Sequence, residues 1–189
     1  ARQAVYISAD PARPTQTGNM LGISPAKASE RFSIEERNSL LKYGVATSVY
    51  AGGYQTIERA ITTYQKNKSG QADNSYLDSE TLHQTAYIIN TLKTAITSKY
   101  SRHKLGDDGQ AFDSGQPVIT PKVARAELIA QYSKLERKAI VENSDKFAEA
   151  LIVERDADSP NRMNVLLPPD YVNQLRVFAL LNQFRLQYA

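Results

Sequence analysis

The two histidines are the side chains whose chemistry is easiest to judge from their neighbours. His83 follows Glu80 by three positions, which places an imidazole and a carboxylate on one face of a helix. A carboxylate-bridged metal site needs a second such pair on a facing helix, and the sequence contains none. His103 lies between Arg102 and Lys104, and cationic neighbours disfavour a bound metal. We predict a polar helix face for the first histidine and a surface or interface position for the second.

Other patterns for catalysis or ligand binding are missing or have a simpler explanation. The sequence has no cysteine, which excludes disulfides, thiolate metal sites and a cysteine nucleophile. It also has no G-x-S-x-G motif and no glycine-rich phosphate loop. The stretches Asp107-Asp108-Gly109 and Asp156-Ala157-Asp158 lack the alternating ligands and final glutamate of a calcium loop, so we interpret them as solvated turns. We expect no catalytic residue, no cofactor and no metal, and therefore no enzyme.

Charge and composition restrict the possible partners. The 189 residues carry a net charge of +3, with lysine and arginine scattered along the chain. Nucleic-acid-binding domains normally gather such residues on one face, so no direct nucleic-acid contact is expected. Hydrophobic residues make up 41% of the chain, enough for a packed core, and no apolar run has the length of a membrane span. The length fits one large domain or two small ones.

Prolines and glycines divide the first third of the chain. Residues 1–10 are compatible with the end of a helix, and the prolines and glycines of residues 11–30 predict an extended connector. Ser33 and Glu36 have capping-box spacing, which marks the start of a short helix. The β-branched and aromatic runs on either side of Gly52-Gly53 predict a hairpin.

Two longer helices follow a polar loop at residues 65–75. The first, about 77–99, has apolar residues at three- and four-residue spacing that predict one buried stripe. The stripe consists of Leu82, Ala86, Ile89, Leu92 and Ile96. The second helix begins after Thr120 with Pro121 in its first position and runs to about Lys138. Its predicted inward residues are Val123, Ala126 and Ala130, with Leu128, Tyr132 and Leu135 as further candidates.

The end of the chain reads as strands after a short helix near 145–150. Strands are predicted at 151–153 and 163–167, with a turn at 156–161 between them. Between 174 and 188, apolar residues first occupy both faces of the segment and then alternate with polar residues, which favours a last strand. The predicted fold class is α+β: a small, mostly antiparallel sheet with two main helices packed on it.

The last strand ends at the chain terminus without a hairpin partner. A long apolar edge strand is a hazard for a monomer, but it is useful when another chain pairs with it. We predict that Leu175–Leu181 lies mainly in its own domain. The candidate subunit-interface residues are Phe184, Arg185, Leu186, Gln187 and Tyr188.

Several stretches, in the same order and at the same spacing, resemble the C-terminal region of the tail sheath proteins of Mu-like bacteriophages. They are Asp10-Pro11-Ala12-Arg13-Pro14, Ile57-Glu58-Arg59, Ile61-Thr62-Thr63-Tyr64-Gln65, Tyr76-Leu77-Asp78-Ser79-Glu80-Thr81-Leu82, Ser98-Lys99-Tyr100, Arg102-His103-Lys104-Leu105, Ile152-Val153-Glu154-Arg155, Pro160-Asn161-Arg162, Leu167-Pro168-Pro169-Asp170 and Val172-Asn173-Gln174-Leu175-Arg176-Val177. One departure is Thr15 together with Gly18-Asn19-Met20, where the family pattern is more apolar.

The resemblance implies a structural role. Residues 1–23 would be an extended connector from a missing N-terminal part, and 24–189 the C-terminal sheath domain, as the lack of an initiator methionine also suggests. Subunits of this family form a helical sleeve around a tail tube, and the sleeve contracts to drive the tube through the host envelope during genome delivery. The implied partners are other copies of the chain, the tail tube protein, the baseplate and the tail terminator, without a membrane. The implied location is the virion, after assembly in the host cytoplasm.

The residues alone leave an alternative of a different class. The chain would then be a soluble binding or enzyme domain whose active site lies in the missing N-terminal part. The assembly state separates the two hypotheses, because only a sheath subunit forms filaments or sleeves.

Overall fold

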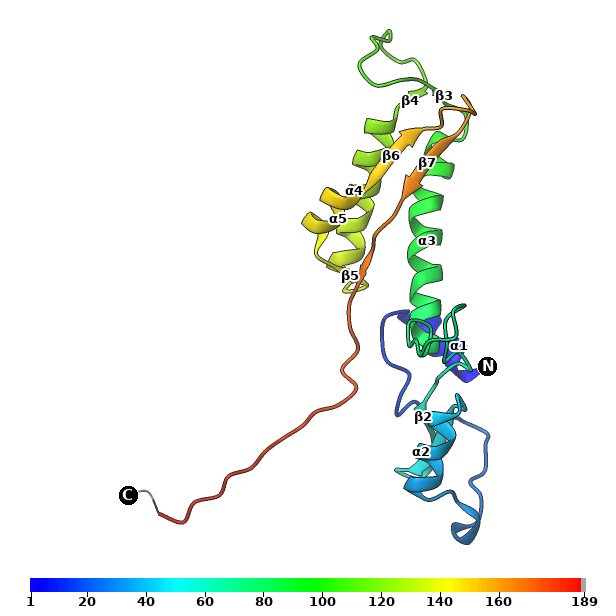
Figure 1. The fold of residues 1–189 in the computed structure, drawn as a ribbon, viewed down its shortest axis with the longest axis vertical. Coiled ribbons are helices and arrows are strands. Elements are labelled where there is room, and N and C mark those ends of the chain that lie inside the picture. Colours follow the sequence, from blue (N-terminus) through cyan, green and yellow to red (C-terminus); the bar gives the residue numbers. More distant parts are fainter. Residues whose placement is uncertain (188–189) are drawn as a thin grey trace.

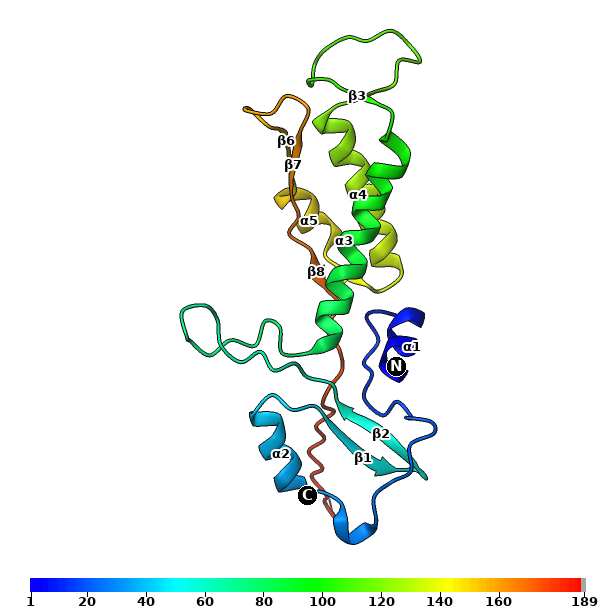
Figure 2. The same ribbon diagram turned by 90° about the vertical axis from the view of Figure 1, so that its right-hand side faces the viewer.

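The two longest helices, α3 (Ser79–Tyr100) and α4 (Pro121–Arg137), lie side by side along the axis of an elongated molecule (Figures 1 and 2). The computed structural model describes residues 1–187. The other helices are α1 (Arg2–Ala9), the short 3-10 helix η1 (Ala28–Glu30), α2 (Ile34–Lys42) and α5 (Ser144–Ala150). The strands are β1 (Thr47–Ala51), β2 (Tyr54–Arg59), β3 (Lys104–Leu105), β4 (Val118–Ile119), β5 (Val141–Glu142), β6 (Ile152–Arg155), β7 (Met163–Leu166) and β8 (Asp170–Tyr171).

The strands form four two-stranded sheets. The pairs β1–β2, β5–β8 and β6–β7 are antiparallel, and β3–β4 is parallel. The α+β class with two main helices is therefore confirmed. The predicted single sheet is instead divided into short ribbons, because long loops and helices separate the strands and each strand pairs with only one other strand within residues 1–187.

The core lies where α3, α4 and α5 meet. Tyr132 of α4 stacks on Phe147 of α5, with ring centroids 3.7 Å apart and planes 4° from parallel. Ile88 and Leu92 of α3 are completely buried beside them. The Tyr132 hydroxyl donates to the carbonyl of Glu142 and accepts from the backbone N–H of Asp170, at 2.9 Å each, so the core side chain also joins β5 to β8.

The buried stripe of α3 differs from the prediction. Leu82 and Ile89 are 40% and 48% exposed, and Ala86 is exposed as well. Leu92 is buried and Ile96 packs against the core as predicted, and the other buried residues of the helix are Glu80, Gln84 and Ile88. Two polar residues take core positions because tertiary partners satisfy them: Gln84 Nε2, for example, donates to the carbonyl of Ile140 at 2.7 Å.

The inward face of α4 is corrected in the same way. Val123 is 41% exposed, and Ala126 and Ala130 are exposed too, whereas the further candidates Leu128, Tyr132 and Leu135 are buried. Larger side chains fill the contact with α3 and α5, and Ala126 and Ala130 face outward. The local signals at the start of the helix are confirmed, because the Thr120 hydroxyl accepts from the N–H of Val123 and Pro121 occupies the first turn.

The N-terminal third adds a hairpin below the helices (Figure 2). Gly52 and Gly53 have φ angles of 58° and 85°, which suit the tight turn between β1 and β2. The connector is hydrogen-bonded to β2: the backbone N–H of Ile57 donates to the carbonyl of Gly18 at 3.0 Å, and the N–H of Thr17 donates to the carbonyl of Ile57 at 2.7 Å. The capping box of Ser33 and Glu36 is confirmed at the start of α2.

Candidate assembly interface

Beyond β8 the chain leaves the body of the molecule in an extended conformation (Figure 1). We call residues 172–187 the C-terminal segment; within them no helix or strand forms. The predicted strand is thus not paired within the described part of the chain. The expectation that Leu175–Leu181 lies in its own domain is wrong, since Leu175 is 71% and Leu181 88% exposed. An extended segment becomes a strand only when another backbone pairs with it, and here none does.

The first residues of the C-terminal segment alternate in an unusual sense. Gln174 and Arg176 are partly buried against the domain, while Leu175 and Val177, which alternate with them, face solvent. The polar side therefore faces inward and the apolar side outward, the reverse of an ordinary surface strand. Further along, Phe178 is exposed to a similar extent. An exposed, continuous apolar edge of this kind marks an interaction surface.

The start of the C-terminal segment is held by the N-terminal connector. Gln174 Nε2 donates to the carbonyl of Ala12, and Gln16 Nε2 donates to the carbonyl of Leu175, both at 3.2 Å. These contacts span more than 150 positions in sequence, so they join the connector to the start of the C-terminal segment.

A charged cluster lies beside these hydrogen bonds, at the start of α3. Nη2 of Arg176 is 3.4 Å from Oδ1 of Asp78 and 3.4 Å from Oε2 of Glu80. Asp78 also pairs with Arg59 of β2 at 3.3 Å. The connector completes the cluster, because Thr15 donates to Oε1 of Glu80 from its backbone N–H at 3.2 Å and from its hydroxyl at 2.6 Å.

Glu80 is fully buried, and its carboxyl is surrounded by hydrogen-bond donors and a cation. Burial raises the pKa of its carboxyl, but the hydrogen bonds from Thr15 and the charge of Arg176 outweigh that effect, and the pKa is lowered. Within residues 1–187, Nη1 and Nη2 of Arg176 are buried without a hydrogen-bond partner. The guanidinium is therefore held by the two carboxylates through charge rather than through aligned hydrogen bonds.

The ribbon β6–β7 offers an acceptor for a further strand. Its inner face packs on α4, with Val153 against the core. Its outward residues Ile152 and Leu166, which lie directly opposite each other in the two strands, are 50% and 61% exposed. Among the described residues each strand pairs only with the other, so both outer edges keep free N–H and C=O groups.

The interface candidates at the chain end lie on the projecting part of the C-terminal segment. Phe184 and Leu186 are 76% and 90% exposed, and Arg185 and Gln187 are exposed with them. Tyr188 lies outside the described residues. No contact with a second subunit is present to test these candidates, so they stay predictions.

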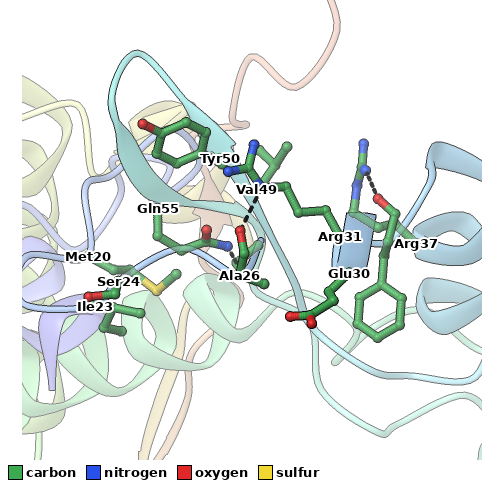
Figure 3. Close-up of a pocket in the computed structure, with 12 residues that line it drawn as sticks. Met20, Ile23, Ser24, Ala26, Glu30, Arg31, Arg37, Val49, Tyr50 and Gln55 are labelled. Carbon is green, nitrogen blue, oxygen red and sulfur yellow. Dashed lines mark hydrogen bonds between the residues drawn. The ribbon is translucent and has the colours of Figure 1, made fainter. Parts of the chain in front are cut away.

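A pocket of about 400 Å³ lies between the loop at 20–32 and the hairpin (Figure 3). The Arg31 guanidinium lies over the Tyr50 ring, 4.4 Å from its centroid, and its Nε donates to the carbonyl of Ala26. Arg37 pairs with Glu58 at 2.8 Å. The residues that line this pocket include no histidine and no nucleophile with a neighbouring base, and its arginines are already engaged, so it has the features of loop packing.

The two histidines lie apart from any ligand cluster. Glu80 is buried against Thr15, whereas His83 is exposed, so the pair does not converge. His103 packs edge-on against Tyr100. Between residues 1 and 187, no group of three or more metal-ligating side chains comes together. No helix in this range is long and apolar enough to cross a membrane.

Comparison with known proteins shows the family to which the chain belongs. A model described as the phage tail sheath C-terminal domain matches residues 71–185. The Mu-like prophage FluMu tail sheath protein of Haemophilus influenzae is 42% identical over 179 residues, which cover 94% of this chain. The chain belongs to the phage tail sheath family. It spans 37% of the length of that relative, and the resemblance to Mu-like sheath proteins is confirmed.

Two solved structures share the sheath fold. A sheath tail protein from Desulfitobacterium hafniense has a TM-score of 0.60 at 12% identity, covering 87% of this chain and 35% of that one. A chain in the baseplate of the anti-feeding prophage has a TM-score of 0.63 at 10% identity, covering 96% and 48%. At such low identities the match establishes the fold, which is therefore common to tail sheath and baseplate structures.

The sequence reasoning missed the buried cluster of this sheath chain. The sequence predicts Glu80 as part of a polar helix face and places both Glu80 and Arg176 in stretches that resemble sheath proteins, without pairing them. A repeat of four residues through Glu80, Gln84, Ile88 and Leu92 is the signal that could have found the buried face of α3. The pairing of Glu80 with Arg176, across nearly 100 positions, has no local signal.

Proposed function

We propose that the chain is a structural, non-enzymatic subunit of a contractile tail sheath. It polymerises with other copies as a helical sleeve around a tail tube, and the sleeve contracts to drive the tube through the host envelope. The observation that carries the proposal is the C-terminal segment, which is extended, apolar on its outer side and unpaired within the described residues. Membership of the tail sheath family supports the same role.

The C-terminal segment has the chemistry of a strand that is donated to another copy. Beyond Arg176 the backbone of the segment up to residue 187 offers a row of free N–H and C=O groups, and side chains such as Phe178, Leu181 and Phe184 supply apolar surface. The outer edges of β6–β7 and the exposed side chains of Ile152 and Leu166 form a matching acceptor. Since donor and acceptor are different surfaces of one chain, each copy can bind the next, and such a contact generates a helix rather than a closed dimer.

The division of the chain follows from this role. Residues 1–23 serve as a connector and 24–189 as the sheath domain, with the tail tube, baseplate and tail terminator as further partners in the virion. The sheath assembles in the host cytoplasm and involves neither a membrane nor direct nucleic-acid contact. Extended and contracted states differ in the packing of rigid subunits, while donated strands keep neighbours joined.

Electron microscopy of the sheath protein coexpressed with its tube protein tests the proposal. We expect sleeves around tubes for the unmodified protein. Phe184→Asp places a charge in the donated strand and should abolish the sleeves, because the acceptor face is apolar. Gln183→Asp adds the same charge on the neighbouring position, which lies on the opposite side of an extended chain, and should preserve them. Tubes that stay bare with the unmodified protein would contradict a sheath function.

A binding measurement locates the acceptor. A fluorescent peptide with the sequence of residues 178–189 is titrated into the chain truncated after Val177. Binding is expected, and Leu166→Asp on β7 should weaken it, whereas Lys93→Asp on the exposed side of α3 should not. Equal binding to both variants would show that β6–β7 is not the acceptor.

A further inference from the structure

The buried cluster around Glu80 has no explanation in the core packing or in the strand exchange proposed above. It lies at the first turn of α3, away from the aromatic core, and it joins three parts of the chain: α3, the connector through Thr15, and the C-terminal segment through Arg176. Ionised groups are costly to bury unless they are paired, and an apolar residue would fill the same space at lower cost. A role for such a cluster beyond packing is to specify one arrangement of its parts.

The position of Arg176 along the chain indicates which arrangement is specified. Before it, Gln174 and the carbonyl of Leu175 are hydrogen-bonded to the connector. After it, Val177 and Phe178 are 78% and 79% exposed, and the following residues up to 187 are exposed as well. Arg176 is therefore the last side chain of the C-terminal segment that the domain holds.

We propose that Glu80 and Asp78 are positioning residues for the C-terminal segment. By holding Arg176 they fix the point and the direction in which the segment leaves the domain, so that only the residues after it are free to reach a partner. The partner is a second copy of the chain, and this part of the inference rests on the proposed function. The anchoring itself is a property of the single chain and is tested on it alone.

The absence of cysteine makes the chain suitable for site-directed spin labels. Labels at Lys93→Cys and Val177→Cys occupy two exposed positions, one on α3 and one directly after Arg176, and the distance between the two labels is measured. Glu80 and Lys93 are about 20 Å apart along the helix, from a rise of roughly 1.5 Å per residue, which suits double electron–electron resonance. We expect a narrow distance distribution in the unmodified chain.

Loss of the anchor should broaden that distribution. Glu80→Gln and Arg176→Met should each make it roughly twofold wider, because the segment loses its fixed point and samples more directions. Arg176→Lys keeps the positive charge and should largely restore the narrow distribution. A second label pair, Arg13→Cys with Lys93→Cys, should stay narrow in Glu80→Gln, because the glutamine oxygen still accepts from Thr15.

The matched control is Arg162→Met, which removes an exposed arginine–aspartate pair at 3.6 Å on the β6–β7 ribbon. It should leave both distributions unchanged. Distributions that stay narrow in Glu80→Gln and Arg176→Met would overturn the proposal. So would a broadening that Arg176→Lys does not reverse, since the cluster would then serve folding in general. Failure of the proposed function is a different result, namely bare tubes with an unmodified chain whose segment is firmly anchored.

Discussion

The helical core and the C-terminal segment are both rich in large apolar residues, but they use them in opposite ways. Ile88 and Leu92 are completely buried between α3 and α4, whereas Leu181 and Leu186 are 88% and 90% exposed. In the core, helices satisfy their own backbone hydrogen bonds and bring apolar faces together. In the C-terminal segment no strand forms within residues 1–187, and beyond Arg176 the apolar side chains have no surface to cover.

The difference shows that apolar content does not decide burial. Polar Glu80 and Gln84 lie inside because connector and loop groups bind them, while apolar residues of the C-terminal segment lie outside. A side chain is buried when its backbone is held close to other elements. The core meets that condition within one chain, and the segment requires a second chain to meet it.

The largest expected effect contrasts two adjacent isoleucines of α3. Ile88→Ala removes a side chain with no exposure and should lower the free energy of unfolding by roughly 2–5 kcal/mol, because a cavity remains. Ile89→Ala is the control: its side chain is 48% exposed, and the change should stay within about 0.5 kcal/mol. Urea unfolding followed by circular dichroism measures both. Equal losses would mean that the burial assigned to α3 is wrong.

A smaller effect is expected from the core hydroxyl. Tyr132→Phe keeps the stacking on Phe147 but leaves the carbonyl of Glu142 and the N–H of Asp170 without this partner. We expect a loss of roughly 1–3 kcal/mol in the same urea measurement, the cost of unsatisfied buried groups. Hydrogen exchange should accelerate at the N–H of Asp170. A change at Tyr171 without one at Asp170 would contradict the assigned hydrogen bond.

Acid should weaken the anchor, because the pKa of the Glu80 carboxyl is lowered in the folded chain. The pKa of Glu80 is lower in the folded chain than its usual value of 4.5, so its contribution to stability is present above that value and is lost as the pH falls through the lower, folded pKa. The groups facing it are Arg176, Thr15 and, through the shared arginine, Asp78. The melting temperature should therefore fall less steeply between pH 7 and pH 2 for Glu80→Gln than for the unmodified chain. Parallel curves would show that Glu80 does not contribute.

The smallest effect is expected where the most apolar surface is deleted. Truncation after Val177 removes the exposed part of the C-terminal segment and keeps Arg176, so the free energy of unfolding should change by less than about 0.5 kcal/mol. Urea unfolding of the truncated chain checks this. A loss comparable to that of Ile88→Ala would show that the segment packs on its own domain and would remove the contrast between the two regions.

Local features were predictable from the sequence, and positions within the fold were not. The capping box at Ser33, the turn at Gly52-Gly53 and the start of α4 at Thr120 were recognised because neighbouring residues alone satisfy their backbone groups. The buried faces of both helices were predicted only in part: Leu92 and Leu128 are buried as expected, but Leu82 and Val123, which are as apolar as the buried residues, are exposed. The candidates at Phe184–Tyr188 lie on the free segment, or beyond the described residues in the case of Tyr188, and stay a proposal.

By itself the sequence determined the α+β class, the helix and hairpin limits, and the family, since these depend on residue type and short spacing. Only the tertiary structure decided that Glu80 is buried, that Arg176 is its counter-ion, and that Leu175 faces outward beside an inward-facing Gln174. The physical reason is the same in each case. Charge pairing and burial depend on which segments meet in space, and the connector and the C-terminal segment meet here from opposite ends of the chain.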